Sequence, residues 1–199
     1  IMMVNMISEW YGCILEENKE NKKMKMDKVA NSGNDEFYTP EYAITPILKY
    51  IPSGSKIWCP FDTKESLFVK MLQNNGCEVL NTHISNNQDF FEIANSEIVD
   101  WCDYIISNPP YSIKTDVLEA LFKTEKPFAM LLGCAGIFES QKRFEMFRDN
   151  EFEVMMFNRR ISYFKDYDEQ KPSKNPPFSS WYICSGVLNK KIVFEEIKK

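Results

Sequence analysis

The chain has 199 residues, of which 44% are hydrophobic and 14% aromatic, so it is long enough for one domain with a packed core. Its formal net charge of −5 is unfavourable for binding a polyanion, unless positive groups are concentrated in one place. No apolar run reaches the roughly 18 residues of a membrane span, and residues 1–7 lack the charged start of a signal peptide.

The cysteines and the single histidine offer little material for a metal site. The six cysteines are scattered, with no C-x-x-C pair, and the only histidine is His83. A structural zinc site needs four such ligands at close spacing. We therefore expect reduced cysteines, no metal and a cytoplasmic location.

The first 34 residues differ in composition from the rest. A lysine-rich charged run, 16–28, is followed by the breaker cluster 31–34. Glutamates dilute the lysines, so the run is typical of a solvated face. We expect a peripheral N-terminal arm over 1–34 and a single domain over 35–199.

From residue 35 onward, strand patterns alternate with helix patterns. Thr39 and Pro40 are a good helix start, and the breaker pair at 75–76 ends the second helix. The expected helices are Pro40–Tyr50, Lys64–Asn74, Asp116–Phe122 and Ser140–Arg148. The expected strands are 57–62, Cys77–His83, Asp103–Ser107, Pro127–Leu132, Glu153–Phe157 and Ser180–Val187, followed by the apolar tail Ile192–Ile197.

Strands separated by helices of about 10 residues imply an α/β domain with a mostly parallel sheet and helices on both faces. Such Rossmann-like sheets bind ligands at the carboxyl ends of their strands, near the point where the strand order reverses. Several polar and aromatic residues of this chain follow directly on predicted strands. We therefore expect the functional site at that edge of the sheet.

The most informative of these strand ends reads Asn108-Pro109-Pro110-Tyr111, directly after the apolar run Tyr104–Ser107. The prolines restrict their own φ and the residue before them, so they predict a rigid loop. In such a loop, the Asn108 side-chain carbonyl and the Pro109 main-chain carbonyl can both point at one planar NH2 group. Tyr111 can stack on the ring that carries this group.

The loop resembles the NPPY signature of methyltransferases that modify exocyclic amino or amide nitrogens with S-adenosylmethionine (SAM). The run Asp35-Glu36-Phe37-Tyr38-Thr39-Pro40 resembles the D-x-x-x-T-P element of phage-encoded DNA adenine methyltransferases of the Dam type. Asn158–Phe164 and Asn175–Ser180 resemble a late G-R-I-x-F … P-F-P-S segment of the same enzymes. The resemblance covers residues 35–188 and implies a SAM-dependent methyltransferase fold, in the cytoplasm of a bacterial or phage-infected cell.

The resemblance also implies which residues bind SAM and where the chain departs from the family. Cys59 stands where the family has an acid, Thr63 and Glu65 stand at glycine positions, and His83 replaces the acid that grips the ribose. Asp62 would then supply the carboxylate for the SAM ammonium group, and Asp89 would accept a hydrogen bond from the adenine of SAM. The implied cofactor residues are Phe37, Tyr38, Thr39, Cys59, Pro60, Phe61, Asp62, His83, Asp89 and Phe90.

A polar stretch between the last two predicted strands carries a small excess of positive charge. Its composition is that of a loop that contacts a nucleic-acid backbone, and equally that of an ordinary surface loop. Its basic residues are Arg159, Arg160, Lys165, Lys171 and Lys174. We take these as candidate DNA-binding residues.

The function that these motifs predict is methyl transfer from SAM to adenine N6 in DNA, with the adenine flipped out of the stack and Asn108, Pro109, Pro110 and Tyr111 as the catalytic loop. Three alternatives stay open. The acceptor is another amino or amide group, in RNA or in a protein glutamine. The chain is a degenerate, non-catalytic relative that binds nucleic acid or a host protein, as the altered Cys59, Thr63 and His83 favour. Or it is an interaction module that never used SAM. Recognition sequence and oligomeric state are not predicted.

Overall fold

The computed structural model describes residues 38–164, 171 and 179–198. Within these residues the chain forms a seven-stranded sheet in the order β2-β1-β3-β4-β6-β5-β7. β6 runs antiparallel to its neighbours β4 and β5, whereas the other neighbouring strands are parallel. The strands are β1 (Lys56–Cys59), β2 (Glu78–Asn81), β3 (Tyr104–Ser107), β4 (Phe128–Gly133), β5 (Glu153–Phe157), β6 (Ser180–Ser185) and β7 (Ile192–Glu195).

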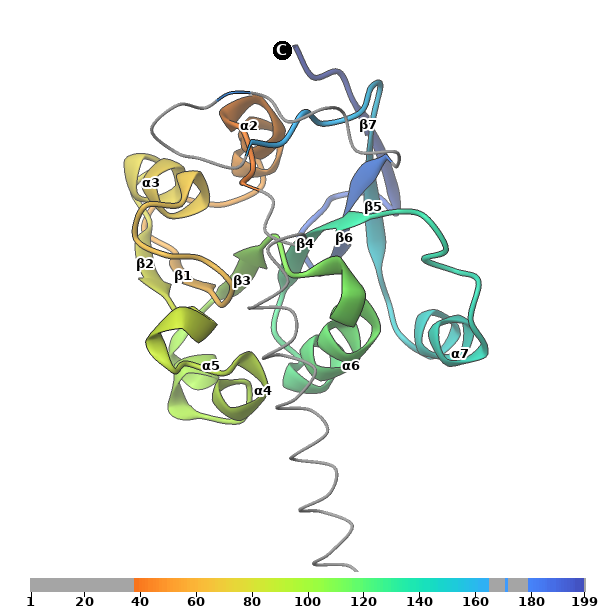
Figure 1. The fold of residues 1–199 in the computed structure, drawn as a ribbon, viewed down its shortest axis with the longest axis horizontal. Coiled ribbons are helices and arrows are strands. Elements are labelled where there is room, and N and C mark those ends of the chain that lie inside the picture. Colours follow the sequence, from red (N-terminus) through yellow and green to blue (C-terminus); the bar gives the residue numbers. More distant parts are fainter. Residues whose placement is uncertain (1–37, 165–170, 172–178, 199) are drawn as a thin grey trace, which may run out of the picture. The chain divides into compact units, whose positions relative to one another are not determined.

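Helices cover both faces of this sheet (Figure 1). Successive residues of a strand point to opposite faces: Ile57 and Cys59 of β1 pack in a cluster with Ile44 and Phe68, from α2 (Glu41–Leu48) and α3 (Leu67–Asn74). Trp58 between them stacks on Phe90, with ring centroids 5.7 Å apart. The helices of this second face are α4 (Phe90–Ile93), α5 (Glu97–Trp101), α6 (Lys114–Thr124) and α7 (Gln141–Asp149). The predicted α/β architecture is confirmed.

Several details of the predicted elements differ from the structure. α2 begins at Glu41, with Pro40 as its N-cap residue and no side-chain cap, and α3 begins at Leu67 and not at Lys64. β1 ends at Cys59 and does not continue to Asp62, because Pro60 has no N–H to donate to the sheet. The short helices α4 and α5 were not predicted, since four and five residues are too few to show a helical period. Each begins at a side-chain cap, Asp89 or Ser96, that accepts a backbone N–H.

The remaining expectations concern the N-terminal arm, membrane spans, metal-binding groups and cysteines. The predicted arm over 1–34 lies outside the described residues. Across residues 38–164 and 179–198, no helix has the length and apolar character needed to cross a membrane. Over the same ranges, no three His, Cys, Asp or Glu side chains group in a way that would hold a metal ion, and the five cysteines there are free thiols.

Candidate active site at the carboxyl ends of β1 and β3

The order of the strands singles out one place on the sheet edge. β1 pairs with β2 on one side and with β3 on the other, so the chain reverses direction across the sheet between β2 and β3. In open α/β sheets, this reversal leaves a crevice outside the carboxyl ends of the two central strands, where ligands bind. The loops that follow β1 and β3 carry the predicted residues Cys59–Asp62 and Asn108–Tyr111.

The loop after β3 is short and fixed at both ends. It joins Ser107, the last residue of β3, to Lys114, the first residue of α6. Pro110 has φ −57° and ψ 128°, and its carbonyl accepts the Ile113 N–H at 3.3 Å, which closes the 3-10 turn η2 (Tyr111–Ile113). Pro109 is buried, and so is the side-chain oxygen of Asn108. The predicted rigid turn between strand and helix is present.

Tyr111 is held through its hydroxyl group. Its oxygen lies 2.6 Å from the Tyr163 hydroxyl and 3.5 Å from Ser180 Oγ, while the ring is partly buried against the core cluster. Tyr163 is 0% exposed. Burial raises the pKa of the Tyr163 hydroxyl well above its ordinary value, and Tyr111 beside it adds to that shift. The Tyr163 hydroxyl is therefore neutral and can donate or accept in its contact with Tyr111.

Asp62, in the loop after β1, has both carboxylate oxygens in hydrogen bonds. Ser66 Oγ donates to Oδ1 and Ser107 Oγ donates to Oδ2 at 2.5 Å. The side chain is 7% exposed. Burial raises the pKa of the Asp62 carboxyl to about 6, against the lowering effect of the hydrogen bonds from Ser107 and Ser66. Asp62 thus connects the loop after β1 with the residue that precedes Asn108.

The main chain of Asp62 also connects to the end of β2. Its N–H donates to the Thr82 carbonyl at 3.2 Å, and its carbonyl accepts from Asn81 Nδ2 at 3.1 Å. Three neighbouring strand ends therefore meet at this one residue. These contacts show the structural role of Asp62; a bond to the SAM ammonium group stays a prediction, and it would have to use the lone pairs that the serines leave.

The other residues of the loop after β1 are buried or packed on aromatic rings. Cys59 is 0% exposed, and burial raises the pKa of its thiol well above the ordinary value, with Asp62 adding to the shift. Pro60 is buried, and Phe61 packs on Phe90 with centroids 4.8 Å apart. Cys59 is therefore a neutral core residue.

The predicted ribose and adenine residues form caps and core contacts. His83 Nδ1 accepts the Ser85 N–H at 3.2 Å at the start of η1 (Ile84–Asn86). Asp89 Oδ1 accepts the Phe91 N–H at 2.8 Å and so caps α4. Phe90 is 1% exposed beneath Trp58. The local contacts fix these residues at the carboxyl end of β2 and after it, and their roles toward a cofactor stay predictions.

The segment before α2 lies against the segment that holds Tyr163. Tyr38 and Phe164 exchange two backbone hydrogen bonds, 3.0 and 3.1 Å long. Thr39 is 4% exposed, and within the described residues its Oγ1 has no hydrogen-bond partner. Since Tyr163 precedes Phe164, the segment that carries Thr39 pairs with the segment that contacts Tyr111. Phe37 lies outside the described residues.

The candidate DNA-binding residues follow β5. Arg159 and Arg160 are exposed, and so is Lys171. Lys165 and Lys174 lie outside the described residues. Tyr163 and Phe164, only a few residues after the two arginines, are buried. The exposed arginines are thus tethered closely to the segment that contacts Tyr111.

Sequence analysis missed several residues that build this edge of the sheet. Ser66 and Ser107 bind Asp62, and Tyr163 and Ser180 bind Tyr111. Ser107 stands directly before the NPPY run, and Ser66 stands at a helix start, where serine is a common cap. The position of Ser107 was therefore a signal, whereas no local pattern indicates that Tyr163 and Ser180 meet Tyr111.

Two basic side chains at the start of α6 and in α7 hold the loop after β4. Arg143 donates to the Ile137 carbonyl at 2.9 Å, to the Gly136 carbonyl at 2.6 Å and to Thr115 Oγ1 at 2.7 Å. Lys114 donates to the Ala135 carbonyl at 2.7 Å. Burial lowers the pKa of Lys114, and the Arg143 charge lowers it further. The loops after β3 and β4 are thus tied together.

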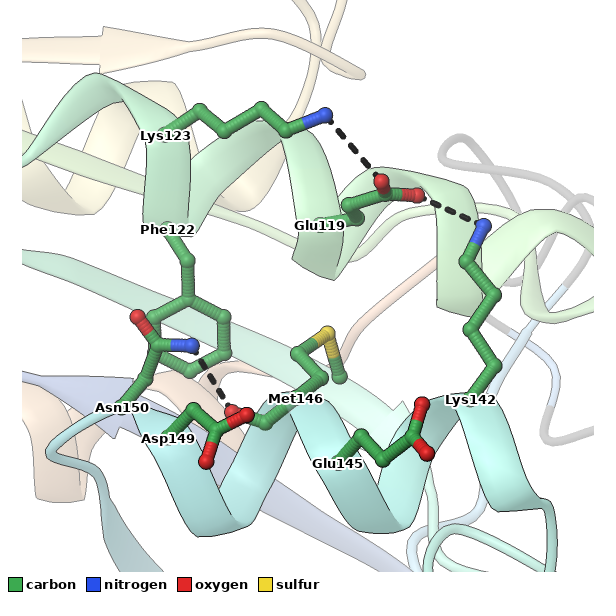
Figure 2. A pocket seen from close by; sticks show the side chains of 8 residues that line it. All are labelled: Glu119, Phe122, Lys123, Lys142, Glu145, Met146, Asp149 and Asn150. Carbon is green, nitrogen blue, oxygen red and sulfur yellow. Dashed lines mark hydrogen bonds and ion pairs between the residues drawn. The ribbon is translucent and has the colours of Figure 1, made fainter.

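A separate surface hollow of about 280 Å³ lies between the second half of α6 and α7 (Figure 2). Lys142 bridges to Glu119 at 2.6 Å across its rim, and Glu119 also pairs with Lys123 at 3.1 Å. Phe122 and Met146 line it too. No predicted site residue contributes to this hollow, so it is not part of the candidate active site.

The comparisons with known proteins add little to this picture. No family model matches the chain, and no curated protein matches it. Among solved structures, the chain is similar to a TehB-like SAM-dependent methyltransferase from Corynebacterium glutamicum. The identity is 15%, the match covers 85% of this chain and 97% of that chain, and the TM-score is 0.37. The description of the fold therefore rests on the strand order and packing given above.

Proposed function

We propose that this protein transfers a methyl group from SAM to the N6 amino group of adenine in DNA. The observation that supports this most is the position of the Asn-Pro-Pro-Tyr loop, which follows directly on β3 beside the reversal of strand order. This is the place where an α/β sheet binds its ligands. The residue types of the loop are those that recognise a planar amino group.

The loop residues would activate the amino group by accepting its two hydrogen bonds. The Asn108 side-chain oxygen, buried in this structure, would have to turn toward the substrate to accept one N–H, and the Pro109 carbonyl would accept the other. These two hydrogen bonds would draw the nitrogen toward tetrahedral geometry and free its lone pair. When bound, SAM would supply a methyl carbon made electrophilic by the positive sulfur, and the electron pair of the broken carbon–sulfur bond would stay on sulfur. The nitrogen then releases its proton to water, so the loop needs no strong base. Its contribution is positional, with the nitrogen held about 3–3.5 Å from the methyl carbon.

The residues around Tyr111 fit a bound cofactor in one respect. The buried hydroxyl of Thr39 has no partner within the described residues, and such a group costs free energy unless something else satisfies it. A polar group of SAM at that point would do so. The segment carrying Thr39 pairs with the segment carrying Tyr163, and Tyr163 contacts the catalytic loop.

One aromatic ring and two exposed arginines support the proposal that the substrate is DNA. Extruding an adenine costs a few kcal/mol, and stacking on an aromatic side chain returns about 1–3 kcal/mol per base. Tyr111 would provide that stack. Arg159 and Arg160, both exposed, would contact phosphates, and each such contact makes binding more sensitive to salt.

A second function is favoured by the loop after β1. Asp62 has both oxygens bound to serines, and Cys59 is a neutral buried thiol where the methyltransferase family has an acid. These contacts stabilise the fold without a ligand, so a chain that had lost SAM binding would still keep them. The alternative is therefore a non-catalytic, methyltransferase-like protein that binds nucleic acid or a host protein through the same edge of the sheet. RNA bases and protein glutamine share the planar amino group and are the alternative acceptors for an active enzyme.

Two measurements separate these functions. SAM at a hundredfold excess over its Kd stabilises a protein that binds it by about 2.7 kcal/mol, so we expect a rise in melting temperature with SAM. Tritiated SAM should then label unmethylated duplex DNA on adenine N6. Label in RNA or protein but not in DNA would overturn the substrate and keep the chemistry. No thermal shift at millimolar SAM and no label in any acceptor would favour the non-catalytic alternative.

A further inference from the structure

Three hydroxyl groups from distant parts of the chain meet beside the catalytic loop. The Tyr111 oxygen lies 2.6 Å from the Tyr163 oxygen and 3.5 Å from Ser180 Oγ. Ser180, at the start of β6, is 1% exposed, and Tyr163 is 0% exposed. Tyr111 comes from the turn after β3, so the contact joins segments 52 and 69 residues apart in the chain. No part of the proposed chemistry so far uses Tyr163 or Ser180.

Tyr163 is itself fixed from both sides. Its neighbour Phe164 exchanges two backbone hydrogen bonds with Tyr38, and its neighbour Ser162 donates its N–H to the Tyr42 hydroxyl at 2.7 Å. Burial keeps the Tyr163 hydroxyl protonated, since its pKa is well above the ordinary value. A neutral hydroxyl on a fixed backbone is a directional partner for a second hydroxyl.

We infer that Tyr163 is a positioning residue that holds the ring of Tyr111 through its hydroxyl, with Ser180 as the second contact, so that the face of the ring meets the extruded base. The inference rests on the proposed function. Because the Tyr111 hydroxyl points at the buried Tyr163 and Ser180, we expect Tyr111 to recognise the base by stacking. Stacking tolerates any base, so the choice of an amino group is left to Asn108 and Pro109.

The holding contact matters because a free ring would have to be ordered when the base arrives. An immobilised side chain costs binding free energy, and pre-ordering it removes that cost. One neutral hydrogen bond contributes about 0.5–1.5 kcal/mol, which corresponds to about 2- to 12-fold in an equilibrium constant. Loss of the Tyr163 hydroxyl is therefore expected to raise KM for DNA about five- to tenfold, with affinity for SAM unchanged.

The test uses Tyr163→Phe and a matched control, Tyr182→Phe. Tyr182 is also 0% exposed and close enough to Tyr111 to interact with it electrostatically. Its hydroxyl donates to the Ala43 carbonyl of α2 at 3.1 Å, so the control removes a buried hydroxyl of the same cluster whose hydrogen bond goes to α2. We expect Tyr163→Phe to raise KM for DNA and the control to leave it within twofold of the unaltered protein. Equal effects of the two variants would overturn the inference.

A double variant tests whether Tyr111 and Tyr163 act through one shared hydrogen bond. Tyr111→Phe removes the other half of the same hydrogen bond, so the combination of Tyr111→Phe with Tyr163→Phe is expected to be no worse than either single change in KM and in urea unfolding. Independent, multiplying effects in both measurements would overturn the inference, because they would mean that the Tyr111 hydroxyl has another partner in the bound state.

The inference and the proposed function fail in different ways. Methyl transfer by the unaltered protein, with no difference between Tyr163→Phe and Tyr182→Phe, would overturn the inference alone. No methyl transfer by the unaltered protein would overturn the proposed function. The inference is then decided by binding of a fluorescent adenine-containing single-stranded oligonucleotide, which Tyr163→Phe is expected to weaken about five- to tenfold and Tyr182→Phe to leave unchanged; no difference there would overturn it.

Discussion

The loops after β1 and β3 start at neighbouring positions on one sheet edge, yet they differ in what their polar groups do. In the loop after β1, the carboxylate of Asp62 accepts hydrogen bonds from Ser66 and Ser107, and Cys59 is buried and neutral. In the loop after β3, two prolines and a 3-10 turn fix the backbone, and Asn108 stands at its start. The side chain of Asp62 in the first loop holds neighbouring strands together, whereas the second loop is held by its backbone turn and by the Tyr111 hydroxyl.

This difference separates two roles that a strand end at the ligand-binding edge can have, support of a neighbouring loop and contact with a ligand. Both loops follow central parallel strands, where a sheet of this order binds its ligands. The internal contacts of Asp62 connect the ends of β1, β2 and β3. We therefore regard the loop after β1 as the support on which the loop after β3 is built, and this comparison can be tested residue by residue.

The largest expected effect is that of Asn108→Ala on methyl transfer. Removing one fixed polar partner of a transition state typically costs a factor of about 10² to 10³ in rate. Stability and SAM affinity should be almost unchanged, because the prolines and the turn η2 hold the loop without this side chain. Single-turnover kinetics with tritiated SAM, together with urea unfolding, measures both. If folding and activity fell together, Asn108 would be only a turn residue.

The second effect is on the pH dependence of stability through Asp62. Its folded pKa of about 6 lies above the ordinary aspartate value of 3.8, so the folded state binds this proton more tightly than the unfolded chain does. The stabilisation is complete below about pH 4 and is lost as pH rises through about 6. Two pKa units correspond to roughly 3 kcal/mol.

The variant Asp62→Asn cannot ionise, so its stability relative to the unaltered protein should rise by up to roughly 3 kcal/mol between pH 4 and pH 7. Urea unfolding of both proteins across this range gives the difference, in which the titration of all other carboxyl groups cancels. A relative stability that falls with pH would show that the serine hydrogen bonds outweigh burial and hold Asp62 ionised.

The order of the elements was predictable from the sequence because it depends on local patterns. The apolar run Tyr104–Ser107 and the two prolines after it are sufficient to place a buried strand, a rigid turn and a helix start. The reversal of strand order was expected only in general terms, since neither the pairing of β1 with β3 nor the antiparallel β6 has a local signature.

The candidate site was predictable only in part, for the same reason. Residues in one motif, such as Asn108 and Tyr111, were found together because the chain brings them together. The partners of Asp62 and Tyr111 lie 45 and 52 residues away in the sequence, at Ser107 and Tyr163. No local sequence pattern around a serine or tyrosine in an apolar stretch predicts which distant residue it contacts, so these contacts could be found only in the structure.

The smallest expected effects are those of replacing Ser66 or Ser107 by alanine, and they distinguish the roles of the two loops most directly. Ser66 and Ser107 bind the two oxygens of the same carboxylate, and both are buried, at 3% and 0% exposed. Ser66 also caps α3 through the Phe68 N–H at 3.2 Å, whereas Ser107 directly precedes Asn108. Changing either serine to alanine should cost about 1–2 kcal/mol of stability, from the lost hydrogen bond and, for Ser66, the lost cap.

The two serines should differ in their effect on turnover. Ser107→Ala removes the side-chain contact between the end of β3 and Asp62, next to Asn108, so we expect a loss of a few-fold in the rate of methyl transfer. Ser66→Ala leaves that contact intact and should change the rate by less than twofold at equal stability. Unfolding curves and single-turnover rates of the two variants form a matched pair. Equal rates would mean that the loop after β3 keeps its geometry without Asp62, and that the two loops are independent. A slower Ser66→Ala variant would instead assign the functional contact to the loop after β1.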